Sequence, residues 1–406
     1  MRIPLASSGL RKKDIDAAIS TLNSGMLTMG VKVREFETAM ANYLGKRYFV
    51  MMNSGSSANL AIFEALMRPS KTLPSLVPGD GILVPAIAWP TTVWPIVQLG
   101  LNPVFVDIDV DNIGLDLEKA QKIIAKSSIP IKGLFPIHPL GYSLENQKLA
   151  SFAKHNKLIL INDVCESLGS WRKGRHAGSE GLASSFSFYF SHHITTMEGG
   201  GVATDDLEFA DDLRAIRSHG WSRDRSDVSD WTTSIPHTDS KFLFVTTGFN
   251  IRPMEIQASI GLLQIADIDT FITRRRFIAK QVMKGLQNTC LSLIDGGCLS
   301  NSDEESAHSW MLLGIKIKSE GAEVLRETVL EKLALLGVET RPILTGNFLD
   351  QPAISRIKAD LPPASNFPGA SKVSKTCFMV SAHHDLTDQQ ISYLSESLRT
   401  VALSIA

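Results

Sequence analysis

Cysteine is scarce in this chain, and no two cysteines are spaced as in a zinc site or a redox motif. The 406 residues include four, at Cys165, Cys290, Cys298 and Cys377. Zinc sites and redox motifs place two cysteines only a few residues apart, and small secreted proteins rely on dense sets of disulfides. The spacing therefore favours reduced thiols over a disulfide framework or a structural metal site.

An excess of charge of either sign is also missing. Lys and Arg total 41, Asp and Glu total 42, and the formal net charge is −1. Nucleic acids and anionic membranes attract strongly basic proteins, so we expect neither as the main partner. No apolar run is as long as a membrane span, and the first residues lack the apolar stretch of a signal peptide. We therefore expect a cytoplasmic location.

What the chain does contain, over its first two thirds, is an alternation of short apolar runs with helical patterns. Such alternation is typical of an α/β fold, in which a large and mostly parallel sheet is covered by helices on both faces. The expected buried strands are residues 47–52, 81–85, 104–107, 132–136 and 157–163, and the expected helices include residues 60–67, 117–125 and 146–156.

The last third begins with a helical pattern over residues 256–286, in which Arg274, Arg275 and Arg276 are expected on an exposed stretch. We interpret this helix as a connection. It would join a large domain, residues 1–255, to a smaller C-terminal α+β domain, residues 256–406. A chain of this length is sufficient for two such domains.

Three further segments have local signatures. Residues 184–190 alternate small polar and aromatic side chains, as in a half-buried strand, and Gly199 to Gly201 permit a tight turn after it. Residues 71–80 and 222–241 are expected to be surface loops, and the second of these is polar with little periodicity.

A turn at residues 53–60 follows an expected strand and opens an expected helix. Gly55, Ser56 and Ser57 would offer backbone N–H groups, hydroxyls and the positive end of a helix to a phosphate. The alternative is that these polar residues only cap the helix, and the motif alone does not decide between the two.

Two further candidates follow expected strands, where ligands of parallel sheets bind. Asp163 ends a very apolar strand, and a carboxylate there can pair with a protonated pyridine nitrogen. Glu166, three residues later, is a candidate for positioning either a catalytic water or the side chain of Asp163. The alternative for both acids is that they only cap the backbone of a loop or helix. Trp89 can stack on a flat ring, although core packing is the better interpretation of this residue alone.

Taken together, these segments resemble the DegT/DnrJ/EryC1/StrS group of sugar aminotransferases and dehydratases over essentially the whole chain. The resemblance rests on the Gly-Ser turn, Trp89, Asp163, Ser187 five residues before His192, Glu198-Gly199-Gly200, and Gly248-Phe249-Asn250 before a helix. It implies the pyridoxal phosphate fold type I, with Ser187 and Asn250 contacting the cofactor phosphate. Asn250 would reach the site of a neighbouring subunit, which implies a homodimer with shared active sites.

The resemblance also shows what is unusual here. In the aminotransferases of this group a lysine binds the cofactor covalently, and counting back from Glu198 puts that position at His192 rather than His193. Histidine cannot form a stable imine with an aldehyde, but it can move a proton near neutral pH. A histidine in this position is typical of the sugar 3-dehydratases of the group, in which it acts as the base.

The expected reaction is therefore removal of the C3 hydroxyl of a nucleotide-linked 4-keto-6-deoxy sugar, with GDP-4-keto-6-deoxy-D-mannose of colitose biosynthesis as the best match. Pyridoxamine phosphate would be the working cofactor, L-glutamate would restore it, and ammonia would be released. An iron–sulfur cluster would require clustered cysteines, which this sequence lacks, so we expect no metal. His219 and Arg341 are weaker candidates for substrate contacts. An aminotransferase and a non-catalytic nucleotide-sugar-binding protein remain the alternatives.

Overall fold

The computed structural model describes residues 1–70, 73, 75–235, 238–297, 307–357, 359 and 361–405. Cys298 and parts of the two predicted loops lie outside these ranges. Within them, no helix has both the length and the apolar character that a bilayer span requires.

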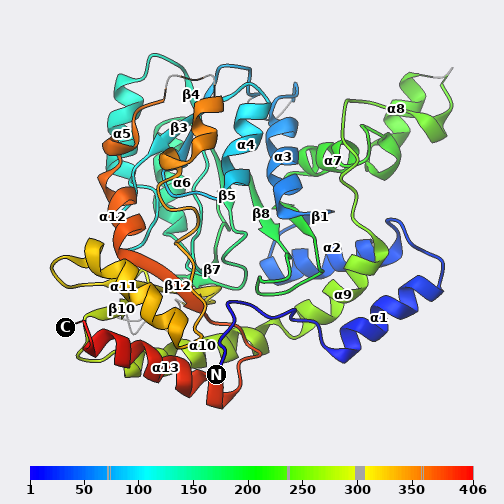
Figure 1. The fold of residues 1–406 in the computed structure, drawn as a ribbon. Helices are drawn as coiled ribbons and strands as arrows, with labels where there is room; N and C mark the ends of the chain where they lie inside the picture. Colours follow the sequence, from blue (N-terminus) through cyan, green and yellow to red (C-terminus); the bar gives the residue numbers. More distant parts are fainter. Residues whose placement is uncertain are drawn as a thin grey trace.

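The large sheet has seven strands in the order β1-β9-β8-β5-β4-β2-β3, and only β9 runs against the others. This confirms the predicted mostly parallel sheet (Figure 1). The strands are β1 (Tyr48–Met52), β2 (Gly81–Pro85), β3 (Asn102–Val106), β4 (Ile131–Leu134), β5 (Ile159–Asp163), β8 (Ala183–Ser187) and β9 (Gly200–Thr204).

Helices bury both faces of this sheet. In β2, Ile82 and Val84 belong to one hydrophobic cluster and Leu83 to another, because successive side chains of a strand point to opposite faces. The helices of this part are α2 (Val31–Leu44), α3 (Gly55–Leu66), α4 (Pro90–Gln98), α5 (Leu117–Lys126), α6 (Asn146–His155) and α7 (Leu207–Ile216). A small hairpin, β6 (Trp171–Arg172) and β7 (Arg175–His176), lies between β5 and β8 in the chain.

A second, antiparallel sheet follows in the order β10-β11-β12, with β10 (Leu291–Leu293), β11 (Leu312–Ile317) and β12 (Cys377–Ser381). It packs with α10 (Ile268–Gly285), α11 (Ala322–Leu335), α12 (Pro368–Thr376) and α13 (Asp388–Leu403). The first residues of the chain pack with the second sheet rather than with the large one. Ile3 is fully buried in the hydrophobic core of the second sheet, and its N–H bonds to the carbonyl of Gly337. The proposed boundary between residues 255 and 256 stays a prediction.

Three expectations need correction. The helical segment 256–286 is two helices, α9 (Glu255–Ala266) and α10, which meet at Asp267. Arg275 is not exposed but fully buried, because it lies on the face of α10 that packs against the hydrophobic cores of the two sheets. The segment 222–241 is not all loop, because it contains the short helix α8 (Val228–Ser234), which projects from the body in Figure 1.

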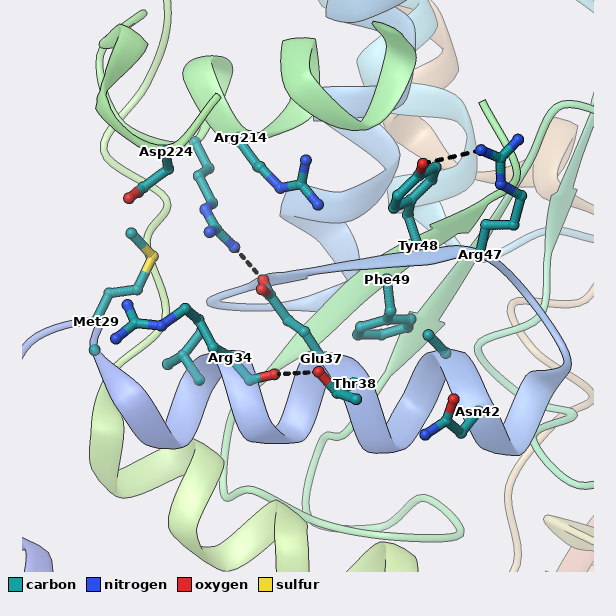
Figure 2. A pocket seen from close by; sticks show the side chains of 14 residues that line it. Met29, Arg34, Glu37, Thr38, Asn42, Arg47, Tyr48, Phe49, Arg214 and Asp224 are labelled. Carbon is teal, nitrogen blue, oxygen red and sulfur yellow. Dashed lines mark hydrogen bonds and ion pairs between the residues drawn. The ribbon is translucent and has the colours of Figure 1, made fainter. Parts of the chain in front are cut away.

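The free edge of β1 is closed by side chains. Glu37 of α2 accepts a 2.8 Å hydrogen bond from the N–H of Met51, and Arg217 donates to the carbonyl of Met51 and to Glu37, at 2.8 and 2.5 Å. These two side chains replace a neighbouring strand. Figure 2 shows Glu37 pointing from α2 into the adjoining pocket of about 430 Å³. Because Glu37 and Arg217 pair with each other and both bond to Met51, this ion pair stabilises the sheet edge.

Candidate active site

The carboxyl ends of the parallel strands meet at a second cavity, of about 280 Å³. Helices α3 and α4 begin at its wall, as is typical of ligand sites in parallel sheets. It is lined by eight of the eleven site residues that the sequence suggested: Gly55, Ser56, Trp89, Asp163, Glu166, Ser187, His192 and Arg341. The other lining residues are Ser54, Thr91, Thr92, Ile137, Cys165, Tyr189, Ser191, Glu198, Met311 and Leu344.

Asp163 lies at the end of β5 and is almost fully buried. One carboxylate oxygen accepts hydrogen bonds from Thr92 Oγ1 at 2.8 Å and Asn59 Nδ2 at 3.1 Å. The other accepts from the N–H of Cys165 at 3.1 Å. Within the described part of the chain, neutral donors and no cation contact this carboxylate, which leaves it able to pair with a positively charged ligand atom.

The first turn of α3 faces the end of β8. Ser54 caps the helix, since its hydroxyl oxygen accepts a 3.0 Å hydrogen bond from the N–H of Ser57. A Cβ on Gly55 would lie 2.6 Å from the Cβ of Ser187, so glycine is needed for this close approach. Gly55, Ser56 and Ser187 line the cavity. Ser57 does not; it takes part in the capping that was the alternative interpretation.

Trp89 is the residue before α4, and Pro90 fixes the first helical position. Trp89 is 48% exposed, which is unusual for a tryptophan, and it lines the cavity. Core packing, which was the better interpretation of this residue alone, is therefore wrong. The ring presents an apolar surface to whatever occupies the cavity.

His192 lies in the turn after β8, where its N–H bonds to the carbonyl of Tyr189 at 2.9 Å. Burial, together with the smaller effects of the cations Arg341 and Arg275, lowers the pKa of His192 to about 3. The imidazole is therefore neutral at physiological pH and able to accept a proton. Its Nδ1 is enclosed and has no hydrogen-bond partner among the described residues. His193, by contrast, is buried outside the cavity, and neither of its ring nitrogens has a hydrogen-bond partner in that part of the chain.

Glu166 and Arg341 form the wall next to the second sheet. Burial raises the pKa of Glu166 above its usual range, although Arg341, with Nη2 at 3.7 Å, and the N–H of Leu140, at 3.0 Å, favour the ionised form. Arg341 follows α11 and bonds through its main chain to Met379 in β12, so the second sheet supplies this cation to the cavity.

Two candidates do not reach the cavity of their own chain. His219 and Asn250 lie on adjacent segments, since the N–H of His219 bonds to the carbonyl of Phe249 at 2.7 Å and Ser218 pairs with Asn250. Both side chains are exposed. Asn250 Oδ1 accepts a hydrogen bond from Arg252 at 3.1 Å.

Sequence reasoning missed several lining residues. Thr92 follows Trp89 in the first turn of α4, so a polar residue just after a strand end was the available signal. Asn59, which holds Asp163 without lining the cavity, lies one turn into α3 on its buried side. Met311 and Leu344 come from the second sheet's side and carry no local motif that distinguishes them from core residues.

No lysine is among the residues that line the cavity in the described part of the chain. One possible metal-binding group, His383, His384 and Asp385, lies elsewhere, beside the fully buried cation Arg275. A second positive charge would be repelled there, so this group is a poor site for a divalent ion.

The arrangement of cavity, strand ends and second sheet can be compared with known proteins. The chain belongs to the DegT/DnrJ/EryC1/StrS aminotransferase family. The family pattern matches residues 9–399. This family and its solved structures confirm the predicted fold, the pyridoxal phosphate fold type I.

Among curated relatives, the chain is 34% identical over 401 residues to GDP-4-keto-6-deoxy-D-mannose 3-dehydratase of Yersinia pseudotuberculosis, covering 98% of each chain. It is 35% identical over 398 residues to the enzyme of that name from Escherichia coli O55:H7, covering 98% of this chain and 99% of the relative. Among solved structures, it matches a His-to-Asn variant of GDP-4-keto-6-deoxymannose-3-dehydratase with bound GDP-perosamine. That match has a TM-score of 0.87, 34% identity and coverage of 98% and 100%.

Proposed function

We propose that this protein is a pyridoxamine phosphate-dependent 3-dehydratase of a nucleotide-linked 4-keto-6-deoxy sugar, with GDP-4-keto-6-deoxy-D-mannose as substrate. The observation that carries this proposal is the cavity itself, which His192 lines and no described lysine lines. By the resemblance, His192 stands where the aminotransferases of the family have their lysine. Similar enzymes of this name, and a solved relative with bound hydrated pyridoxal phosphate, support it.

The residues of the cavity fit this cofactor. Asp163, satisfied only by neutral donors, suits a protonated pyridine nitrogen. The N-terminus of α3, with Gly55, Ser56 and Ser187, suits a phosphate. Trp89 offers an exposed aromatic face to the ring. When bound, the cofactor supplies an amine for the C4 ketone of the sugar and a ring that accepts electrons.

The side chains then have distinct tasks. His192 accepts a proton on Nε2, because Nδ1 is enclosed and burial keeps the ring neutral. Glu166, whose pKa burial raises, holds Arg341 in place and orders water at the cavity wall. The sugar loses one oxygen as water, and L-glutamate supplies the two electrons as it becomes 2-oxoglutarate and ammonia. The water released from the sugar equals the water needed to convert glutamate into 2-oxoglutarate and ammonia. The balanced reaction is therefore sugar plus glutamate to deoxysugar, 2-oxoglutarate and ammonia.

We further propose a cytoplasmic homodimer with shared sites, in which Asn250 serves the partner's cavity and His219 lies beside it. Asn250 lies away from the cavity of its own chain, which supports a role in the neighbouring one. Helix α1 (Lys12–Asn23) projects from the body (Figure 1) and exposes Ile15, Ile19 and Leu22 along one face, at 46, 51 and 53%. A continuous apolar face of this kind usually marks an interface.

The test is product analysis of purified protein supplied with GDP-4-keto-6-deoxy-D-mannose, pyridoxal phosphate and L-glutamate. Mass spectrometry should find a sugar nucleotide lighter by one oxygen atom, together with stoichiometric ammonia. A product in which an amine replaces the ketone, without free ammonia, would identify an aminotransferase instead. The CDP- and dTDP-linked sugars, tested in parallel, determine the nucleotide, and an unchanged sugar with all three would refute the dehydratase proposal.

A further inference from the structure

Arg275 has an environment that differs from those of the arginines on either side of it. It lies in α10 and is fully buried, whereas Arg274 reaches the surface and pairs with Asp388 at 2.7 Å. Among the described residues, no carboxylate lies within ion-pair distance of Arg275. Asp385 acts on Arg275 only as a more distant charge. Burying a cation without a contacting counter-ion is costly, so the groups that bond to Arg275 must compensate.

Those groups are all main-chain carbonyls. Nη1 donates to Trp310 at 3.0 Å, to Met311 at 2.8 Å and, more weakly, to Ala382 at 3.5 Å. Nη2 donates to the carbonyl of His192 at 3.1 Å. The planar guanidinium therefore joins the turn that carries His192 to the segment that enters β11.

Both attachment points continue into the candidate active site. His192 and Met311 line the cavity. The N–H of Met311 also bonds to the carbonyl of Leu140 at 3.0 Å, and the N–H of Leu140 bonds to Glu166. One buried cation thus lies behind two walls of the cavity, and its hydrogen bonds define the position of each wall relative to the other.

We propose that Arg275 is a positioning residue that fixes the main chain of His192 and so directs its imidazole into the cavity. This inference rests on the proposed function of His192 and extends it to a residue that contacts neither cofactor nor substrate. Its physical basis is that a group acting on a proton must be held within a fraction of an ångström of its working position.

The charge of Arg275 has a second effect in the same direction. After burial and Arg341, it is the third cause that lowers the pKa of His192, and it also lowers the pKa of His193. Arg275 therefore helps to keep the imidazole in the neutral form that accepts protons.

The test compares Arg275→Met, which removes the charge and the donors, with Arg275→Lys, which keeps the charge but not the fork. Arg274→Met, one residue away, is the matched control. We expect kcat to fall on the order of 10- to 100-fold in Arg275→Met with little change in KM, and to fall less in Arg275→Lys. Arg274→Met should remain within about twofold of the unmodified enzyme.

A readout independent of turnover is the ¹³C chemical shift of His192 Cε1 at pH 7.5 in cofactor-free protein labelled at histidine Cε1. The His192 signal is assigned by its absence in His192→Asn. Its chemical shift should change in Arg275→Met and stay in place in Arg274→Met, because only the first variant releases the main chain of His192. If Arg275→Met does not fold, a kcat loss with a changed His192 chemical shift in Arg275→Lys supports the proposal.

Two outcomes would overturn it: a folded Arg275→Met protein with an unchanged kcat and an unchanged His192 chemical shift, or an Arg274→Met protein with equal losses. An inactive parent enzyme whose His192 chemical shift still responds to Arg275→Met would refute the proposed function and not this inference.

Discussion

The hydroxyl of Thr92 lies 2.8 Å from the carboxylate of Asp163, although 71 residues separate them in the chain. Thr92 is fully buried in the first turn of α4, and Asp163 ends β5. Two elements that meet at the carboxyl edge of the sheet thus fix the orientation of the acid that we assign to the cofactor.

Thr92→Val should weaken cofactor binding. Valine keeps the shape of threonine but removes a donor to a buried charged group, a loss of about 1.5–3 kcal/mol at most. We expect the dissociation constant of pyridoxal phosphate, measured by absorbance titration, to rise roughly 10-fold. The matched control is Thr91→Val, because Thr91 also lines the cavity but only its main-chain carbonyl, bonded to Asn59, takes part. Equal affinities in the two variants would contradict this role of Thr92.

Shared active sites can be tested by mixing inactive subunits. We expect His192→Asn and Asn250→Ala homodimers to be inactive or weak. If Asn250 acts in the partner's cavity, a heterodimer of the two variants contains one site with both native residues. Co-expression with two different affinity tags isolates this heterodimer, and its activity should return to about half that of the unmodified dimer. If the heterodimer shows no activity above that of its parents, Asn250 does not serve the partner's site.

Acid should destabilise this protein steeply. Burial lowers the pKa of His138 and His384 to about 4, of His192 to about 3 and of His383 to about 2. The unfolded chain, with a histidine pKa near 6.5, then binds more protons than the folded one. Stability is therefore complete above about pH 6.5 and falls as the pH decreases. Between pH 7.5 and 5.5 each histidine costs about 1.4 kcal/mol.

Denaturant unfolding at pH 7.5 and 5.5, at one protein concentration, measures this loss. His384→Phe is the informative variant. The ring of His384 stacks on Phe271 with the ring centroids 4.1 Å apart, and Asp385 lies 3.5 Å from its Nε2. It makes no hydrogen bond to any described residue, so phenylalanine replaces the neutral ring without loss of a hydrogen bond. We expect a smaller difference between the two pH values in this variant. A free energy of unfolding that is equal at both pH values in the unmodified protein would show that these histidines protonate freely when folded.

The sequence predicted the part of the site that local patterns encode. Asp163 ends an apolar strand, and Gly55 and Ser56 open a helix, so position along the chain sufficed to place them at one edge of a sheet. Ser57 has the same local pattern but points into the helix cap, a difference that only the rotation of the first turn determines. Ser187 was suggested by the family resemblance and ends β8 in the structure.

The residues that were missed or misplaced depend on tertiary packing. Arg275 stands in a run of three arginines and was expected at the surface. Its burial follows from the contact between α10 and the segment entering β11, which local periodicity does not encode. Thr92 and Asn59 gain their roles only when α3 and α4 converge on β5.

If His192 is the base of a dehydratase, glutamate-dependent ammonia release must depend on His192 and not on its neighbour His193, and a comparison of His192→Asn with His193→Asn measures this. The two histidines are adjacent, but only His192 lines the cavity. We predict that ammonia release falls on the order of 10²- to 10⁴-fold in His192→Asn and stays within about tenfold of the unmodified rate in His193→Asn. Undiminished ammonia release by His192→Asn, or a larger loss in His193→Asn, would contradict the account.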